Sequence, residues 1–433
     1  MVVLTSYYLT LQAMITLSKL RNSDSHKREE YGEPSSVKLT DRKQNSAYST
    51  SFEAAYPFVL HDQIVDGYLA ITFDDLIQEN EETSLIVQDA MFSGKRKAFV
   101  KDGSRLVKVK LKDGTENTFE LPICSDAPTG LLGHSIDQLM ITEEHWLSEV
   151  QLSERLTDIG PAGNWRPEHC IARSRLAIII PFRNRSDHLP RLLSSLIPIL
   201  KRQLIDFRFI VAEQFGDHLF NKGRLMNAAF TVAEMLKVDC VIFHDVDLFP
   251  TDDRNPYGCP LNPRHVGAFV DTLGYELPYN YLAGGVLAIR TEHFKSINGY
   301  SNVYWGWGGE DDDIGKRIVR SGLVLERPDT VHGRMTMLKH EQRWPKSQHL
   351  VERLVANAAK RMRTDGLNQN FWRIIKITRR PLYYHIYVDV GTPPEVWFKP
   401  DPDDTAANGA VHISLWLAKK GRLNWQRTPL GIS

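Results

Sequence analysis

The chain has little cysteine and no net charge, and both facts reduce the number of function classes that it can belong to. Its 433 residues include 53 Lys and Arg against 53 Asp and Glu, so the formal net charge at pH 7 is zero. No nucleic-acid partner is therefore expected. The cysteines lack the C-x-x-C spacing that zinc sites favour, and they fit either two disulfides or buried free thiols. They are Cys124, Cys170, Cys240 and Cys259.

The N-terminus lacks the basic flank that precedes a signal peptide or signal anchor. Met1–Ser18 carries no charge, contains several hydroxyl residues, and is followed rather than preceded by basic residues. We interpret it as a weak N-terminal membrane anchor of about the minimum spanning length. Residues 19–105 are predicted to be a polar stem and a poorly defined N-terminal region. Leu106–Leu111 and Thr115–Leu121 flank a Lys-Asp-Gly turn and predict a β-hairpin.

The most unusual stretch is Tyr304–Asp313, in which two tryptophans and three glycines run into four acids. Asp311–Ser321 follows helical spacing and ends at Gly322, so the acids are predicted at a helix N-terminus, where the helix dipole favours negative charge. Adjacent carboxylates repel, which predicts a raised pKa for at least one. An acidic helix cap is the alternative, but two large rings among glycines favour a binding site because such a stretch is too glycine-rich for core.

The middle of the chain alternates buried strands with amphipathic helices. Leu176–Pro181 and Phe207–Ala212 are apolar runs typical of strands buried on both faces, and Cys240–Asp247 reads as a third strand. A leucine-rich helix is expected after the first strand, and Lys222–Leu236 after the second. The pattern predicts an α/β fold with a Rossmann-like sheet flanked by helices, whose ligands bind beyond the carboxyl ends of the strands.

A charged motif is expected at the end of two of these strands. Asp245 and Asp247, placed two apart at the end of the third strand, are predicted to point the same way and hold a divalent cation. Arg183 and Arg185 follow the first strand, and a metal with two arginines suits a diphosphate. The alternative is a solvated strand end or a helix cap.

Several longer segments match one known pattern in order and spacing. They are Ile178–Arg185, Phe220–Asn221, Phe243–Leu248, Gly284–Gly285, Ile297–Tyr300, Tyr304–Ile314, Met337–His340 and Asp389–Pro393. Together they resemble the beta-1,4-galactosyltransferase family, Golgi enzymes with a nucleotide-sugar-binding α/β fold of the GT-A type. The resemblance implies a catalytic domain over residues 106–393, an unassigned tail over 394–433, and the disulfides Cys124–Cys170 and Cys240–Cys259.

The resemblance also implies the roles of individual residues. The metal would be Mn2+, held by Asp247, Met337 and His340. The thioether of Met337 would not be chosen from chemistry alone, because Mn2+ prefers oxygen and nitrogen. The residues implied to bind the UDP-sugar donor are Pro181, Phe182, Arg183, Arg185, Phe220, Asn221, Asp245, Val246, Leu282 and His340.

The acidic stretch would hold the acceptor, which by resemblance ends in N-acetylglucosamine. The contacts implied are Gly308, Gly309, Glu310, Asp311 and Asp312. Asp311 would take the proton of the attacking hydroxyl as general base in one inverting displacement. Its neighbour Glu310 is the rival for this role, and spacing alone does not separate the two. Trp307 would lie on a small mobile loop beside the donor sugar.

The chain departs from the family pattern in two places. Glu341–Val355, in the segment expected to close over the donor, is about one residue short. In addition, Leu282 stands where galactose-specific members have a tyrosine, and Ala283 where they have an aromatic residue. The smaller side chains would leave room for an acetamido group, which favours N-acetylgalactosamine over galactose as donor. Refilling of the gap by Tyr281 is the alternative, discounted because strand alternation would point that ring to the opposite face.

A different class of function is also open. A catalytically silent, lectin-like protein could keep this fold. The residues that argue for an enzyme are all intact, and they are Asp247, His340, Glu310 and Asp311. Either a glycoprotein or a glycolipid could carry the acceptor. By resemblance, the expected location is the Golgi lumen, as a type II membrane protein attached through its N-terminus.

Overall fold

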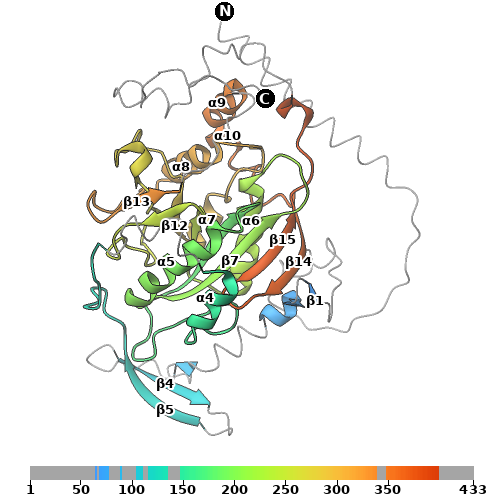
Figure 1. Cartoon of the computed structure of the whole chain (residues 1–433). Helices are drawn as coiled ribbons and strands as arrows, with labels where there is room; N and C mark the ends of the chain where they lie inside the picture. Colours follow the sequence, from blue (N-terminus) through green and yellow to red (C-terminus); the bar gives the residue numbers. More distant parts are fainter. Residues whose placement is uncertain are drawn as a thin grey trace, which may run out of the picture. The chain divides into compact units, whose positions relative to one another are not determined.

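The structure is a computed structural model (Figure 1). It describes residues 64–65, 68–77, 88–89, 104–110, 116–134, 147–338 and 348–398. These residues belong to one compact unit, which runs from Phe58 to the C-terminus. The predicted anchor, most of the predicted stem, His340 and the tail after residue 398 lie outside the described residues.

In this part of the chain, nine strands form a mixed central sheet. The predicted strands are present as β6, β7 and β8, which run parallel to one another and to β15. Antiparallel strands extend the sheet at both edges, so the predicted mixed α/β fold is confirmed. In spatial order the strands are β1 (Ile64–Val65), β2 (Tyr68–Ile71), β14 (Arg373–Arg379), β15 (Tyr384–Asp389), β7 (Asp206–Gln214), β6 (Arg175–Phe182), β8 (Cys240–His244), β12 (Val286–Arg290) and β10 (Arg264–His265).

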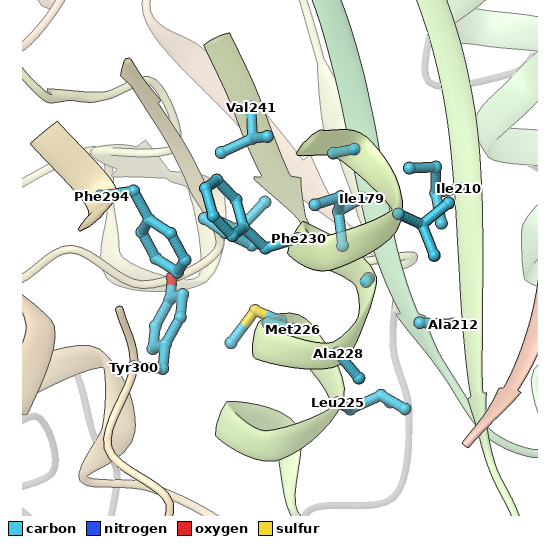
Figure 2. Packing of buried hydrophobic residues seen from close by; sticks show 14 of the residues in the cluster. Ile179, Ile210, Ala212, Leu225, Met226, Ala228, Phe230, Val241, Phe294 and Tyr300 are labelled. Atoms are coloured by element: carbon cyan, nitrogen blue, oxygen red, sulfur yellow. The ribbon is translucent and has the colours of Figure 1, made fainter. Parts of the chain in front are cut away.

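Helices cover both faces because successive residues of the central strands are apolar and point to opposite sides. In β6, Leu176 and Ile178 pack into one cluster with α5 (His188–Arg202) and α4 (Glu149–Arg155). Ala177 and Ile179 pack into the other with α6 (Lys222–Met235), α7 (Thr291–Ser296) and α8 (Glu310–Arg320). Figure 2 shows this second layer, where Met226 and Phe230 of α6 lie against the sheet.

Two smaller sheets accompany the central one. In the first, β13 (Arg334–Met337) pairs with β11 (Phe269–Val270) and β9 (Leu248–Pro250). The second contains the predicted hairpin, β4 (Ser104–Lys110) and β5 (Glu116–Pro122), with β3 (Gln88–Asp89) at its edge. The remaining short elements are η5 (Pro161–Gly163), η6 (Asp271–Leu273), α9 (Gln348–Ala356), α10 (Ala358–Arg361) and η7 (Glu395–Trp397).

The cysteines pair as the family resemblance implied. The structure contains the Cys124–Cys170 and Cys240–Cys259 disulfides. The central sheet also takes in β1 and β2 from the segment interpreted as stem and N-terminal region, and Trp397 is buried in the core beyond the expected domain end. In the described ranges, no helix has the length and apolar character needed to cross a membrane.

We expect the α6 side of the core to tolerate loss of an aromatic ring poorly. Phe294 is fully buried, and its ring centroid lies 4.6 Å from that of Phe230 and 4.8 Å from that of Phe243. Phe294→Ala should lower the free energy of unfolding by about 3–5 kcal/mol, measured by urea titration. Val331→Ala, at a 60% exposed position, is the control and should change it by less than about 0.5 kcal/mol. Equal effects of the two substitutions would contradict this packing.

Candidate active site

The Asp245-Val246-Asp247 motif lies in a turn, and the predicted strand is shorter than expected. β8 ends at His244 and β9 begins at Leu248, so strand alternation does not direct the two carboxylates. That part of the prediction was wrong. The carboxylate of Asp245 contacts Lys222, whereas the carbonyl of Asp247 accepts a 2.8 Å hydrogen bond from the backbone N–H of Leu338, the residue directly after β13. Val246 packs into the core beside α5.

One ammonium group joins this turn to the acidic stretch. Lys222 is the first residue of α6, and its Nζ lies 3.0 Å from Asp245 Oδ1, 3.4 Å from Glu310 Oε1 and 3.4 Å from Asp311 Oδ1. We call these four side chains the acid–lysine cluster. The sequence did not single out Lys222, and its only signal was its place directly after the predicted donor residues 220–221.

The four consecutive acids of α8 meet four different surroundings. Glu310 is only 6% exposed, whereas the side chain of Asp311 is 25% exposed. Asp312 accepts a 2.7 Å hydrogen bond from the hydroxyl of Tyr279, and Asp313 is fully buried. Asp311 therefore combines access from solvent with membership of the acid–lysine cluster, which is the position that a general base needs.

Two carboxyl groups have a raised pKa, and burial is the main cause of both shifts. The sequence predicted such a shift for at least one acid of the acidic stretch, from repulsion between neighbouring carboxylates. Burial raises the pKa of Glu310 to about 8, and the charge of Asp311 adds to the rise while Lys222 opposes it. Burial likewise raises the pKa of Asp245 to about 6 against the effect of Lys222. Burial lowers the pKa of Lys222, but the surrounding carboxylates outweigh it and hold that pKa well above its usual value.

Asp313 fixes the start of α8 instead of binding a ligand. Its carboxylate accepts hydrogen bonds of 2.5 Å from both Arg317 Nε and Arg361 Nη2, and one of 2.9 Å from the Tyr304 hydroxyl. Arg317 Nη1 also donates a 2.7 Å hydrogen bond to the backbone carbonyl of Asp365. These buried ion pairs tie the helix that carries Glu310, Asp311 and Asp312 to the segment after α10.

The two tryptophans of the acidic stretch have different environments. Trp305 is only 2% exposed and packs in the core, with the Arg224 guanidinium carbon 4.8 Å from its ring centroid. The expectation that this stretch is too rich in glycine to be core was therefore wrong for Trp305. Trp307 is 39% exposed, and this exposure fits the expectation that its ring contacts a ligand. Gly308 and Gly309 have φ of 90° and 94°, a region that favours glycine.

Two of the predicted donor residues lie together. Arg183 donates a 2.6 Å hydrogen bond to the backbone carbonyl of His218, and its guanidinium carbon lies 5.0 Å from the ring centroid of Phe220. A flat base could bind beside such a ring and guanidinium pair. Asn221 caps α6, since its buried side chain accepts a hydrogen bond from the backbone N–H of Arg224 and donates one to the backbone carbonyl of Asn302. Its predicted role in donor binding stays a prediction.

Other predicted donor residues belong to the ends of the strands. Pro181 is buried in β6, and Arg185 precedes α5 and is partly exposed. The side chain of Phe182 packs on the α5 face, where it lines a cavity of about 600 Å³ together with Glu213, Tyr383 and residues of α4 and α5. None of the acid–lysine cluster lines this cavity, and the donor role of Phe182 stays a prediction.

The structure brings together two of the three predicted Mn2+ ligands. Met337 pairs with Leu248 in the β13–β9 ladder, and the next backbone N–H binds the carbonyl of Asp247. His340 lies outside the described residues. Among described residues, no three His, Cys, Asp or Glu side chains group as metal ligands. The carboxylate of Asp247 fits a hard cation, and its charge helps to raise the pKa of Asp245, a repulsion that a cation would relieve.

The segment that carries Leu282 is a turn, because β12 begins only at Val286. Strand alternation therefore does not place Tyr281, contrary to the expectation. Its ring nevertheless lies on the flank of α8, 4.6 Å from that of Tyr279 and 5.0 Å from Lys316 Nζ. Ala283 packs in the core and adds no space to a donor pocket, which corrects a second expectation. Leu282 is buried, with 8% exposure.

Comparison with known proteins agrees with these features. Residues 124–260 match the N-terminal region of glycosyl transferase group 7, and residues 264–341 match the N-terminal domain of galactosyltransferase. Beta-1,4-galactosyltransferase 1 of Mus musculus is 40% identical over 284 residues, which cover 64% of this chain and 69% of that protein. The chain belongs to the beta-1,4-galactosyltransferase family. It is therefore a hexosyltransferase.

A further relative and a solved structure are also similar to this chain. Beta-1,4-galactosyltransferase 6 of Rattus norvegicus is 40% identical over 60% of this chain and 67% of its own length. Among solved structures, the catalytic domain of Drosophila beta1,4galactosyltransferase 7 in complex with xylobiose is 28% identical. It covers 52% of this chain and 97% of its own, with a TM-score of 0.45.

Glu310 should make the stability of the metal-free protein depend on pH. Its pKa of about 8 in the folded state lies above the ordinary value of 4.5 expected in the unfolded chain. The folded state therefore binds this proton more tightly and loses stability as pH rises from about 4.5 to about 8. Glu310→Gln removes that loss. The melting temperature of the variant minus that of the natural protein should rise between pH 5 and pH 8, measured by differential scanning fluorimetry with a chelator present. A constant difference would contradict the buried carboxyl.

Proposed function

We propose that this protein is a Mn2+-dependent inverting glycosyltransferase that moves a hexose from a UDP-sugar, in β-1,4 linkage, to an acceptor ending in N-acetylglucosamine. The observation that carries the proposal is the acid–lysine cluster. It gathers Asp245 and Asp311 at the carboxyl ends of the parallel strands, where ligands of such sheets bind. Asp247 and Met337 lie beside it.

Asp311 is the proposed general base, with Glu310 as its weaker rival. A base must be ionised and must reach the acceptor hydroxyl. Asp311 is partly exposed, whereas Glu310 is buried and its raised pKa favours the protonated form at neutral pH. Tyr279 holds Asp312, so this neighbour is oriented to accept a second hydroxyl of the acceptor. Trp307, Gly308 and Gly309 complete the proposed acceptor side.

The proposed donor side holds the nucleotide and its diphosphate. The residues at the ends of β6 and β8 and the Arg183–Phe220 pair would bind the uridine and phosphates. A divalent cation held by Asp247, Met337 and His340 would neutralise charge on the leaving diphosphate. Lys222 lies against Asp245 and can contribute positive charge on the same side.

The donor sugar has two candidates. The relatives are named galactosyltransferases, which favours galactose. Leu282 favours N-acetylgalactosamine, since a leucine in place of the tyrosine expected from the family pattern removes a ring and a hydroxyl. Without Ala283 as a source of further space, this argument rests on Leu282 alone.

The proposed setting is the Golgi lumen, with attachment to the membrane through the N-terminus. Two disulfides suit an oxidising compartment. The catalytic domain is proposed to span residues 106–393, with β1 and β2 added to its sheet by the preceding segment. The predicted anchor at residues 1–18 and the tail lie outside the described residues, apart from the tail's first residues up to 398.

Asp311→Asn should remove the base while it keeps the size of the side chain. We expect kcat to fall by roughly 10²- to 10⁴-fold, with UDP affinity in the presence of Mn2+ nearly unchanged. Initial rates with a β-N-acetylglucosaminide acceptor and calorimetric titration with UDP would measure the two effects. Glu310→Gln is the matched control and should lower kcat less. The reverse order would assign the base to Glu310.

Leu282→Tyr should discriminate between the two donors. If Leu282 makes room for an acetamido group, the natural protein prefers UDP-N-acetylgalactosamine, and the tyrosine variant shifts preference toward UDP-galactose. Both donors would be offered in competition with Mn2+ and the same acceptor, and the products separated by chromatography. Preference for galactose in the unmodified protein would contradict the role of Leu282. Transfer of neither sugar, with UDP still bound, would favour the lectin-like alternative.

A further inference from the structure

The segment from Tyr279 to Gly285, which we call the strap, packs against α8 and is hydrogen-bonded to it. The Tyr279 hydroxyl binds Asp312 at 2.7 Å. A Cβ added to Gly315 of α8 would lie 1.8 Å from the carbonyl oxygen of Tyr281, so the helix and the strap backbone are in close contact. A Cβ added to Gly284 would lie 2.7 Å from Asp311 Oδ2. The strap backbone at Gly284 is therefore packed directly against the side chain of Asp311, the proposed base.

The other side of the strap is held by two residues that the proposed reaction does not use. His265 Nε2 lies 2.7 Å from the carbonyl oxygen of Gly284. Arg327 Nη2 donates to the carbonyl of Asn280 at 2.6 Å. Leu282 lies between these two attachment points, so its position depends on both.

His265 is built as a rigid hydrogen-bond donor. It is 1% exposed, and its backbone N–H binds the carbonyl of Glu326 at 2.8 Å while β10 pairs with β12. The carbonyl of Gly284 only accepts, so the ring proton must be on Nε2. Nδ1 is buried without a hydrogen-bond partner. Burial, with a smaller effect of Arg327, lowers the pKa of His265 to about 3, so the ring is neutral at physiological pH.

We propose that His265 is a positioning residue that holds Gly284 against Asp311 and thereby sets both the placement of the base and the donor preference expressed at Leu282. This inference rests on the proposed function. Loss of this hydrogen bond leaves the carbonyl of Gly284 with only the 3.0 Å bond from the backbone N–H of Val286, its near neighbour in the chain, and lets the strap move relative to α8. Such movement changes the distance to the base, which affects kcat, and the room beside Leu282, which affects the choice of donor.

The test compares three substitutions of His265. His265→Gln can place an amide donor near the position of Nε2, whereas His265→Met fills a similar volume without a donor. His265→Asn keeps a polar side chain but ends near the position of Nδ1, too short to reach Gly284. It serves as the second variant if the methionine protein does not fold. For each, kcat and KM are measured with UDP-galactose and with UDP-N-acetylgalactosamine.

We expect the methionine and asparagine variants to lose about tenfold in kcat, because the buried carbonyl of Gly284 loses its side-chain donor. The ratio of kcat/KM for the two donors should shift by about threefold or more, and His265→Gln should restore both values toward those of the natural protein.

His385→Met is the matched control. His385 is also a buried histidine with one 2.8 Å hydrogen bond, to Glu213 on the α5 face, away from the strap. It should lower the melting temperature without changing the donor ratio.

A purely structural role for His265 gives a different result. All three variants would then lose stability while the donor ratio stays fixed, and this outcome overturns the proposal. A glutamine variant as impaired as the methionine variant also overturns it. Failure of the proposed function is separate, because the unmodified protein would then transfer neither sugar.

Discussion

The contact of one lysine with three carboxylates is the interaction on which the site depends. Asp245 comes from the turn after β8, and Glu310 and Asp311 from the start of α8, so like charges from two segments meet in a buried place. Without Lys222 their repulsion would separate the two segments. Burial makes the charged form of Glu310 costly, and the pKa of this group is raised as a result. A UDP-sugar would therefore bind in a site where the ammonium group of Lys222 already holds the carboxylates in place.

The fold followed from the sequence because long apolar runs leave few alternatives. The strand now seen as β6 is buried on both faces, and the predicted leucine-rich helix is present as α5. Helix α6 begins at the predicted Lys222, and α8 begins one residue before the predicted Asp311. The disulfide partners came from family resemblance, since four cysteines allow several pairings. Only the resemblance could suggest Met337 as a ligand.

The errors have a common physical cause, which is that tertiary packing decides where short segments bend. The last three residues of the predicted strand, Asp245–Asp247, and the segment at Tyr281 both lie in turns, and contacts to residues far along the chain fix them. Trp305 belongs to the core because α6 supplies Arg224 to cover its ring. Lys222 was missed because its partners are distant in sequence, and a single lysine at a helix start carries no local signal.

The close approach of the strap to α8 limits how the donor pocket can change. A side chain cannot be added at Gly284 or Gly315 without moving a backbone or the proposed base. Ala283 is enclosed by core, and Tyr279 is bonded to Asp312. Of the two strap positions at which the chain departs from the family pattern, Leu282 and Ala283, only Leu282 lies outside the core clusters and can vary while the acids stay in place. A library that seeks enzymes for other sugars would gain most from full variation at this residue, because simultaneous variation of its neighbours would mainly yield proteins with a displaced base.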